Sequence, residues 1–208
     1  MICRVIITFI FGISSFLYAS IIEAPDLFMQ RTTEAVLSEL KALPANDLVR
    51  VYALIDKDIL PFVDVEYMSR WVAGRKAWGN ASAEQKKLFQ VTFQKLMTQT
   101  YSSTLFLFKD RAMIYSRPPR VDYQKAKTIP VYCEIKQANK ESIQVIYQLR
   151  LVNKQWKIFD VLVEGVSMLK GLQSQYEQVI AQNGLAGGVD AMNLKLNQQT
   201  STSEKRDK

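Results

Sequence analysis

The spacing of apolar residues along the chain changes once, from a helical pattern to a strand pattern. In residues 27–43 and 47–60, apolar residues recur every three and four positions, and a proline follows each segment. A short third helix is expected from Asp64, a suitable N-cap, to about Gly74. The first part of the chain is therefore predicted to be helical.

A longer helix is predicted to begin at residue 82. Ser82 as N-cap and Gln85 three positions later form a capping box, in which each side chain accepts a backbone N–H of the other residue. One broad face of this helix is apolar or aromatic and carries Phe89, Phe93, Leu96, Met97, Thr100, Tyr101 and Leu105.

From about Arg111 the period of the apolar residues becomes two. Four segments rich in β-branched and aromatic residues follow one another, with short loops at 138–140 and 153–154. Short connections favour an antiparallel meander. One face of the third segment is apolar and carries Ile143, Val145, Tyr147, Leu149 and Leu151. Helices must cover this face, so the predicted fold class is α+β, a curved antiparallel four-stranded sheet wrapped by helices on one face.

Both ends of the chain differ from this domain. Residues 1–19 combine a basic start at Arg4 with an apolar run and a small residue at Ala19, a pattern typical of a cleaved secretory signal. After Gly165 helical spacing returns and is expected to stop near Asn183 and Gly184, with a short last helix beyond. Residues 20–196 are interpreted as a single domain, and the polar residues 197–208 as a disordered tail.

Composition narrows the possible chemistry. The chain of 208 residues has no histidine, the commonest general base and metal ligand, so no catalytic or metal site is expected. Cys133 lies in an alternating segment and is interpreted as a small residue packed in a strand. The net charge of +7 is spread along the chain. It suits anionic lipid headgroups or an acidic protein partner, and nucleic acid is not expected in an exported protein.

Asp160 and Glu164 stand out because their neighbours are almost all apolar. In a strand the two residues share a face about 13 Å apart, which exceeds the roughly 5 to 9.5 Å between the paired carboxyl groups of glycosidases. A structural role is favoured: Asp160 could pair with a basic residue, and Glu164 could accept backbone donors where the chain turns. A single Asp acting as a base in a pocket stays open as an alternative.

Three segments stand out in order: FVDVEYMSRWVAGR from residue 62, SAEQKKLFQVTFQKLMTQTYSSTL from residue 82, and WKIFDVLVEGVSMLKGLQSQYEQVIAQNGLAGGVDAM from residue 156. Together they resemble the MlaC family, also called toluene-tolerance or ABC-transporter auxiliary proteins. The most specific part is the block around Asp160, Glu164 and Ser167, followed by Asn183 to Gly187. The resemblance spans residues 27–196. The sequence departs slightly from the family pattern at RKAWGN and in the short loop 138–140. The resemblance therefore does not extend to partner contacts at these two places.

The resemblance implies an NTF2-like fold with an apolar pocket and a periplasmic phospholipid carrier without a cofactor. Such proteins pass phospholipid between an outer-membrane lipoprotein complex and an inner-membrane ABC transporter with an MCE-domain subunit, and maintain outer-membrane lipid asymmetry. Transient contact with the membrane surface and a monomeric state are also expected.

The pocket is predicted between the apolar face of the sheet and the long helix. Its expected lining residues are Phe93, Met97, Tyr101, Val145, Tyr147, Val163, Val166 and Leu169. Ordinary core packing would give the same pattern, because periodicity indicates a buried face and not a cavity behind it. An NTF2-like enzyme and an adaptor that binds no lipid are the alternative functions.

Overall fold

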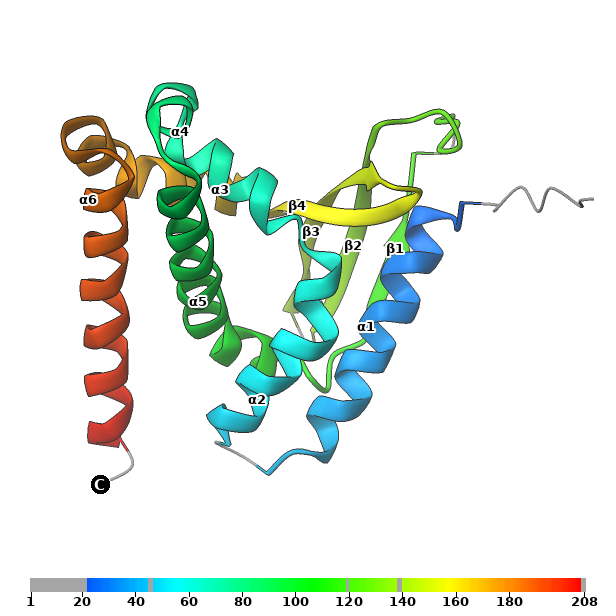
Figure 1. Ribbon diagram of the computed structural model, residues 1–208. Coiled ribbons are helices and arrows are strands. Elements are labelled where there is room, and N and C mark those ends of the chain that lie inside the picture. The colour runs from blue at the N-terminus through cyan, green and yellow to red at the C-terminus, as the bar shows by residue number, and fades with distance from the viewer. Residues whose placement is uncertain (1–21, 45–46, 119, 138–139, 207–208) are drawn as a thin grey trace, which may run out of the picture.

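The computed structural model describes residues 22–44, 47–118, 120–137 and 140–206 (Figure 1). The predicted signal segment 1–19 and residues 138–139 of the predicted loop lie outside the described residues. The helical elements are α1 (Pro25–Ala42), α2 (Leu48–Leu54), the π-helix η1 (Ile55–Ile59), the 3₁₀-helix η2 (Leu60–Phe62), α3 (Val65–Ala73), α4 (Arg75–Asn80), α5 (Ala83–Leu107) and α6 (Met168–Arg206). The strands are β1 (Met113–Ser116), β2 (Thr128–Gln137), β3 (Lys140–Val152), β4 (Gln155–Val163) and β5 (Val166–Ser167).

Local capping fixes where the helices begin. The Asp64 carboxylate accepts the backbone N–H of Tyr67 at 3.0 Å. The predicted capping box is confirmed: Ser82 N–H donates to Gln85 Oε1 at 2.8 Å, and Gln85 N–H donates to Ser82 Oγ at 3.2 Å. Each bond satisfies a backbone donor that the first helical turn leaves free.

The helix predicted over residues 47–60 is not one regular helix. After α2 the chain widens into the π-helix η1, in which the N–H of Leu60 bonds to the carbonyl of Ile55, five residues back. It then tightens into η2. The prediction of one α-helix is wrong because apolar spacing does not reveal a change in helical pitch.

The sheet is an antiparallel meander in the order β1-β2-β3-β4-β5. Asn153 and Lys154 both have positive φ, 49° and 63°, as a two-residue hairpin turn requires. The prediction of four strands missed β5. This strand of two residues follows a second tight turn at Glu164 and Gly165 and pairs with the end of β4.

A bulge in β4 changes which side chains share a face. Gln148 lies opposite Asp160 and Leu149 lies opposite Ile158, so Phe159 has no residue opposite it in the register. Ile158 and Val161 therefore both contact clusters on the side that faces α1, although strict alternation predicts opposite faces.

The sequence predicted that helices cover one face of the sheet only. In the structure, helices contact both faces. On one face, α1 packs Phe28 and Met29 against the strands. Arg150 alternates with Leu149 and points to the other face. There its guanidinium lies 3.1 Å from the carboxylate of Asp64 and 4.4 Å from the centre of the Tyr67 ring. The start of α3 is thereby fixed against the opposite face.

The last helix has two limbs, residues 168–183 and 185–206, which meet at a kink where Gly184 has φ 66° and ψ −163° (Figure 1). The predicted stop near Asn183 and Gly184 is confirmed. The predicted disordered tail is wrong for residues 197–206, which continue the second limb. Leu196 at the start of this stretch is buried, and Gln199 Nε2 within it donates to Thr100 Oγ1 on α5 at 3.0 Å.

Buried apolar residues form separate clusters. The helical core, made by α3, α5 and α6, contains Met68, Val72, Ala73, Phe89, Phe93, Leu96, Leu169, Leu172, Tyr176, Ile180, Leu185, Val189, Met192 and Leu196. Gly188 permits this packing, because a Cβ there would lie 2.8 Å from Ile180 Cγ1 and 3.0 Å from Phe89 Cε2. Other clusters join α1 to the sheet and α1 to α2 and η1.

Candidate functional site

The side of the sheet that faces α1 carries an apolar surface that is only partly covered. Its sheet-face cluster has a buried part, Cys133, Ile135 and Val145, and a half-buried part, Phe108, Met113, Tyr115, Ile143, Tyr147 and Val161. Strand register assembles it, because Tyr115 lies opposite Cys133, which lies opposite Val145. In Figure 1, α1 and α5 stand on either side of this sheet region. The half-buried apolar side chains form a surface that stays partly accessible.

The polar groups of this cluster are uncharged. The Tyr115 hydroxyl donates to Thr33 Oγ1 on α1 at 2.6 Å, and the Tyr115 and Tyr147 rings lie 6.1 Å apart. Burial raises the pKa of both phenols above the ordinary value, and burial raises the pKa of the Cys133 thiol to about 11. Because all three groups are protonated near neutral pH, the surface suits an uncharged, apolar ligand part.

Cys133 is buried in β2, which confirms the interpretation of a small residue packed in a strand. A thiol with a raised pKa has little thiolate and is a poor nucleophile.

A polar pocket borders the sheet face where α1 meets the end of β1. It has a volume of about 460 Å³ and includes Asp26, Tyr115 and Arg117 in its lining. Arg117 is paired with the Asp26 carboxylate, and its guanidinium lies 5.1 Å from the centre of the Tyr123 ring. Through Tyr115, an apolar surface and a charged, open pocket adjoin each other.

Asp160 joins β4 to the turn that leads into α6. Its carboxylate accepts the N–H of Leu169 at 3.0 Å, the hydroxyl of Ser167 at 2.6 Å and the N–H of Val161 at 2.8 Å. Ser167 in turn accepts the N–H of Lys170 at 3.1 Å, as an N-cap residue does. The predicted structural role is therefore supported, but the partners are backbone groups and a hydroxyl instead of the basic residue that was expected.

Glu164 fixes the same turn to β3. Its side chain accepts the N–H of Gln144, and its own N–H donates to the Gln144 carbonyl at 2.9 Å. The expectation that Glu164 accepts a backbone donor is confirmed, with the donor on the neighbouring strand. Both carboxylates thus have hydrogen-bond partners that hold the fold together.

The eight predicted lining residues do not come together in one place. Phe93, Met97 and Leu169 belong to or pack against the helical core, where Phe93 is stacked on Phe89. Tyr101 is half-buried and near enough to Tyr176 of α6 to contribute to the raised pKa of that phenol, whose main cause is burial. Their face of α5 therefore packs mainly against α6 and not against the sheet.

The sheet contributes the other four residues. Val145 and Tyr147 lie together in the sheet-face cluster, on the apolar face of β3. Val163 and Val166 pair with each other beside the tight turn and are 39% and 70% exposed. Met113, Tyr115, Cys133 and Val161 were missed, although β-strand alternation with the neighbouring strands places them on the face of Val145 and Tyr147.

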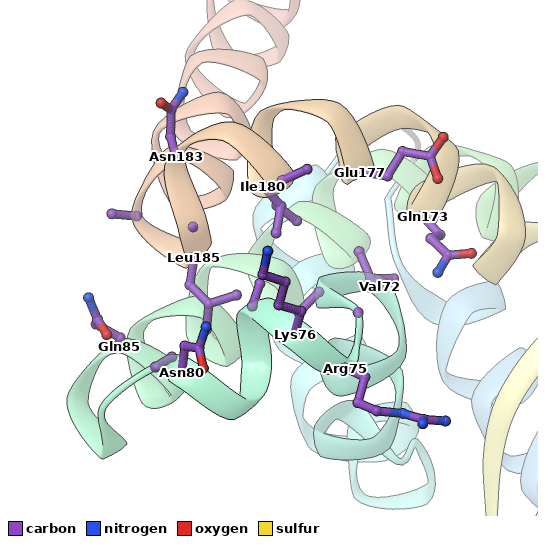
Figure 2. Close-up of a pocket in the computed structure, with 17 residues that line it drawn as sticks. Val72, Arg75, Lys76, Asn80, Gln85, Gln173, Glu177, Ile180, Asn183 and Leu185 are labelled. Carbon is purple, nitrogen blue, oxygen red and sulfur yellow. The ribbon is translucent and has the colours of Figure 1, made fainter.

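A second pocket lies on the helical side, between α3 and α4 and the kink of α6 (Figure 2). Its volume is about 470 Å³, and charged, amide and apolar side chains all contribute to its lining. Among the described residues, no group of three or more His, Cys, Asp or Glu side chains could hold a metal ion. The helices of the described ranges include none with the length and apolar character needed to cross a membrane.

Fold and site together define a class: an α+β protein whose open antiparallel sheet has an apolar face that its own helices cover only in part. Within that class, the chain belongs to the MlaC family, whose model, described as "MlaC protein", matches residues 30–198.

Two relatives agree with this assignment. The chain is 26% identical over 184 residues to the intermembrane phospholipid transport system binding protein MlaC of Haemophilus influenzae, covering 86% of this chain and 83% of that protein. It is 24% identical over 165 residues to the toluene tolerance protein ttg2D of Pseudomonas putida, covering 78% and 75%.

A solved structure shares the fold. It is described as the phospholipid-binding protein from Ralstonia solanacearum in complex with a phospholipid, and it matches with a TM-score of 0.77 at 22% identity, covering 86% of this chain and 99% of that chain.

Proposed function

We propose that the protein is a periplasmic phospholipid carrier, the soluble component of an ABC-type lipid transport system. Membership of the MlaC family carries this proposal. The names of the relatives, which refer to phospholipid transport and toluene tolerance, support the ligand class. The partly covered apolar surface of the sheet is the physical feature that fits it.

The acyl chains are assigned to the sheet-face cluster. Exposing an acyl chain to water costs about 0.8 kcal/mol per CH₂, so two chains with roughly 25 to 30 methylenes would cost about 20 to 24 kcal/mol. A carrier must provide an apolar surface of its own, and the half-buried side chains of Ile143, Tyr147 and Val161 provide one. This proposal includes an NTF2-like arrangement, in which α1, α5 and the sheet enclose an apolar pocket.

The headgroup is assigned to the pocket at Asp26 and Arg117. This pocket adjoins the apolar cluster at Tyr115, is open to solvent and carries both signs of charge. A phosphate could pair with the Arg117 guanidinium, which recognises oxyanions well.

The wider role follows the family expectation. The carrier would exchange phospholipid with an outer-membrane lipoprotein complex and with an inner-membrane ABC transporter that has an MCE-domain subunit, maintaining outer-membrane lipid asymmetry. It would act after cleavage of the signal segment, as a monomer that contacts the membrane surface only transiently. We infer no enzymatic role, because Asp160 and Glu164 already hold structural partners.

Native mass spectrometry tests the proposal. The mature protein is purified from the periplasm without detergent, and the same sample is extracted for lipid analysis; near-stoichiometric phospholipid is expected. Val161→Lys and, as a second variant, Met113→Lys should reduce bound lipid at least tenfold while circular dichroism remains native.

Val166→Lys is the matched control, since this valine is 70% exposed and a lysine there should leave lipid binding intact. A folded wild-type protein that stays lipid-free even after incubation with liposomes would refute the carrier and favour an adaptor. A turnover lost in Asp160→Asn would favour an enzyme.

A further inference from the structure

The pocket beside the α6 kink lies away from the sheet-face cluster. Its floor is apolar, with Val72, Ile180 and Leu185 of the helical core among its lining residues. α4 and the turn at Gly74 contribute one side, and both limbs of α6 contribute the other. No residue of this pocket belongs to the sheet-face cluster.

Cations and amides surround this floor. Arg75 and Lys76 are exposed, and neither side chain has a hydrogen bond, ion pair or ring contact with any described residue. Figure 2 shows the Lys76 side chain extending toward α6, while Arg75 points outward on the side of Gln173. Asn80 and Asn183 add amide donors and acceptors. Glu177 is the one acidic residue among the lining residues. With Arg75 and Lys76, the lining therefore carries a net positive charge.

The kink of α6 at Gly184 lies in the lining of the pocket. An apolar floor, a polar rim and unpaired arginine are the composition of a protein interface.

We infer that this pocket is a docking site for an acidic segment of a protein partner. The inference rests on the proposed function, because a soluble carrier must dock with the complexes that load and unload it. Carboxylates of the segment would pair with Arg75 and Lys76, its amide groups with Asn80 and Asn183, and an apolar side chain would lie on Ile180 and Leu185. Docking on this side leaves the sheet-face cluster free to exchange lipid.

A protein partner fits better than a membrane surface. A bilayer is broad and selects protruding basic and apolar side chains. Here the apolar atoms form the floor of a recess, and Glu177 lines the same recess. Only a narrow chain segment can place carboxylates near the cations and still reach that floor.

Photo-crosslinking in cells tests the inference. A photoreactive amino acid replaces Asn80 in the full chain, with Val49, which is 77% exposed on α2, as the control position. The crosslinked partner peptide is identified by mass spectrometry. An adduct specific to position 80 and mapping to an acid-rich segment is expected.

Charge reversal provides the second step. Arg75→Glu with Lys76→Glu should lower the adduct yield roughly tenfold, because each cation would become a repelling charge. Lys95→Glu with Lys195→Glu makes the same change in net charge outside the pocket and should leave the yield unchanged. Changing the acidic residues of the partner segment to lysine should restore the adduct of the reversed variant.

Bound phospholipid is measured in every preparation, so that failure of docking and failure of lipid carriage give different results. Loss of the adduct with normal lipid content supports the inference, as does an acid-rich adduct in a protein that lacks lipid. Equal adducts at positions 80 and 49, or an adduct that survives charge reversal, would overturn it. So would binding to phosphatidylglycerol vesicles that depends on Arg75 and Lys76 in a protein that gives no adduct.

Discussion

The helical core and the sheet-face cluster are both apolar, but their side chains are buried to different extents. Most residues of the helical core are closely packed: Phe89 and Phe93 are stacked within it, and Gly188 lets two helix limbs approach closely. In the sheet-face cluster only Cys133, Ile135 and Val145 are buried, and the surrounding apolar residues stay half-buried. Of these two regions the first therefore contributes more to stability, and the second has surface left for a ligand.

The largest effect should come from opening the helical core. Phe93→Ala removes a fully buried ring and should lower the free energy of unfolding by about 3 to 5 kcal/mol. Urea titration measures this loss, and the protein that remains folded should keep its bound phospholipid. Val161→Ala, in the half-buried cluster, is the counterpart and should cost about 1 kcal/mol or less while reducing lipid. Equal costs for the two truncations would contradict the comparison.

The next largest effect should come from Asp160, which links the sheet to the start of α6. Asp160→Ala leaves the N–H of Leu169 and the hydroxyl of Ser167 without their acceptor, and the expected loss of stability is about 2 to 3 kcal/mol. Asp190→Ala is the control, because that exposed carboxylate has no hydrogen-bond or ion-pair partner among the described residues. If the two variants unfold at the same urea concentration, Asp160 does not join the regions.

An effect no larger than that of Asp160→Ala is expected from alkaline pH, and its source lies in the sheet. Burial raises the pKa of the Cys133 thiol from 9.0 to about 11, so the folded state keeps its proton when the unfolded chain has lost it. This contribution to stability is fully present below about pH 9 and is lost as the pH rises toward 11. The slope for one proton is at most about 1.4 kcal/mol per pH unit. Unfolding measured across this range should be less pH-dependent in Cys133→Ala, and an unchanged slope would exclude the thiol as its source.

The smallest effect should come from Glu164→Gln. Its side chain is exposed, and a neutral amide oxygen can still accept the N–H of Gln144, so about 0.5 kcal/mol is expected. Thermal unfolding with lipid analysis would check this, with bound lipid unchanged. A large loss of lipid would mean that the turn also takes part in the ligand site.

Local chemistry was readable from the sequence, and long-range packing was not. The capping box at Ser82 and the hairpin at Asn153 depend on neighbouring residues, and both formed as predicted. Periodicity also found the apolar face of α5, but it does not say which element covers that face. Phe93 therefore packs with α6 instead of facing the sheet.

The remaining errors have the same cause. The bulge at Phe159 becomes visible only in the register with β3, and the helical order of residues 197–206 depends on α5 as a partner. Tyr115 was within reach of sequence reasoning, because extending the alternation of β3 to its neighbours would have placed it beside Tyr147.

The wide turn η1 sets the rotational phase of the chain that follows it. A π turn amounts to one residue more than an α turn, and one residue corresponds to about 100° of helical rotation. Residues before it, Val51 and Leu54, face α1 in one cluster, while Phe62 beyond it reaches the Phe28 ring at 5.5 Å in another. Deleting a single residue from η1 would turn Phe62 away from Phe28, so the length of this segment is as constrained as its composition.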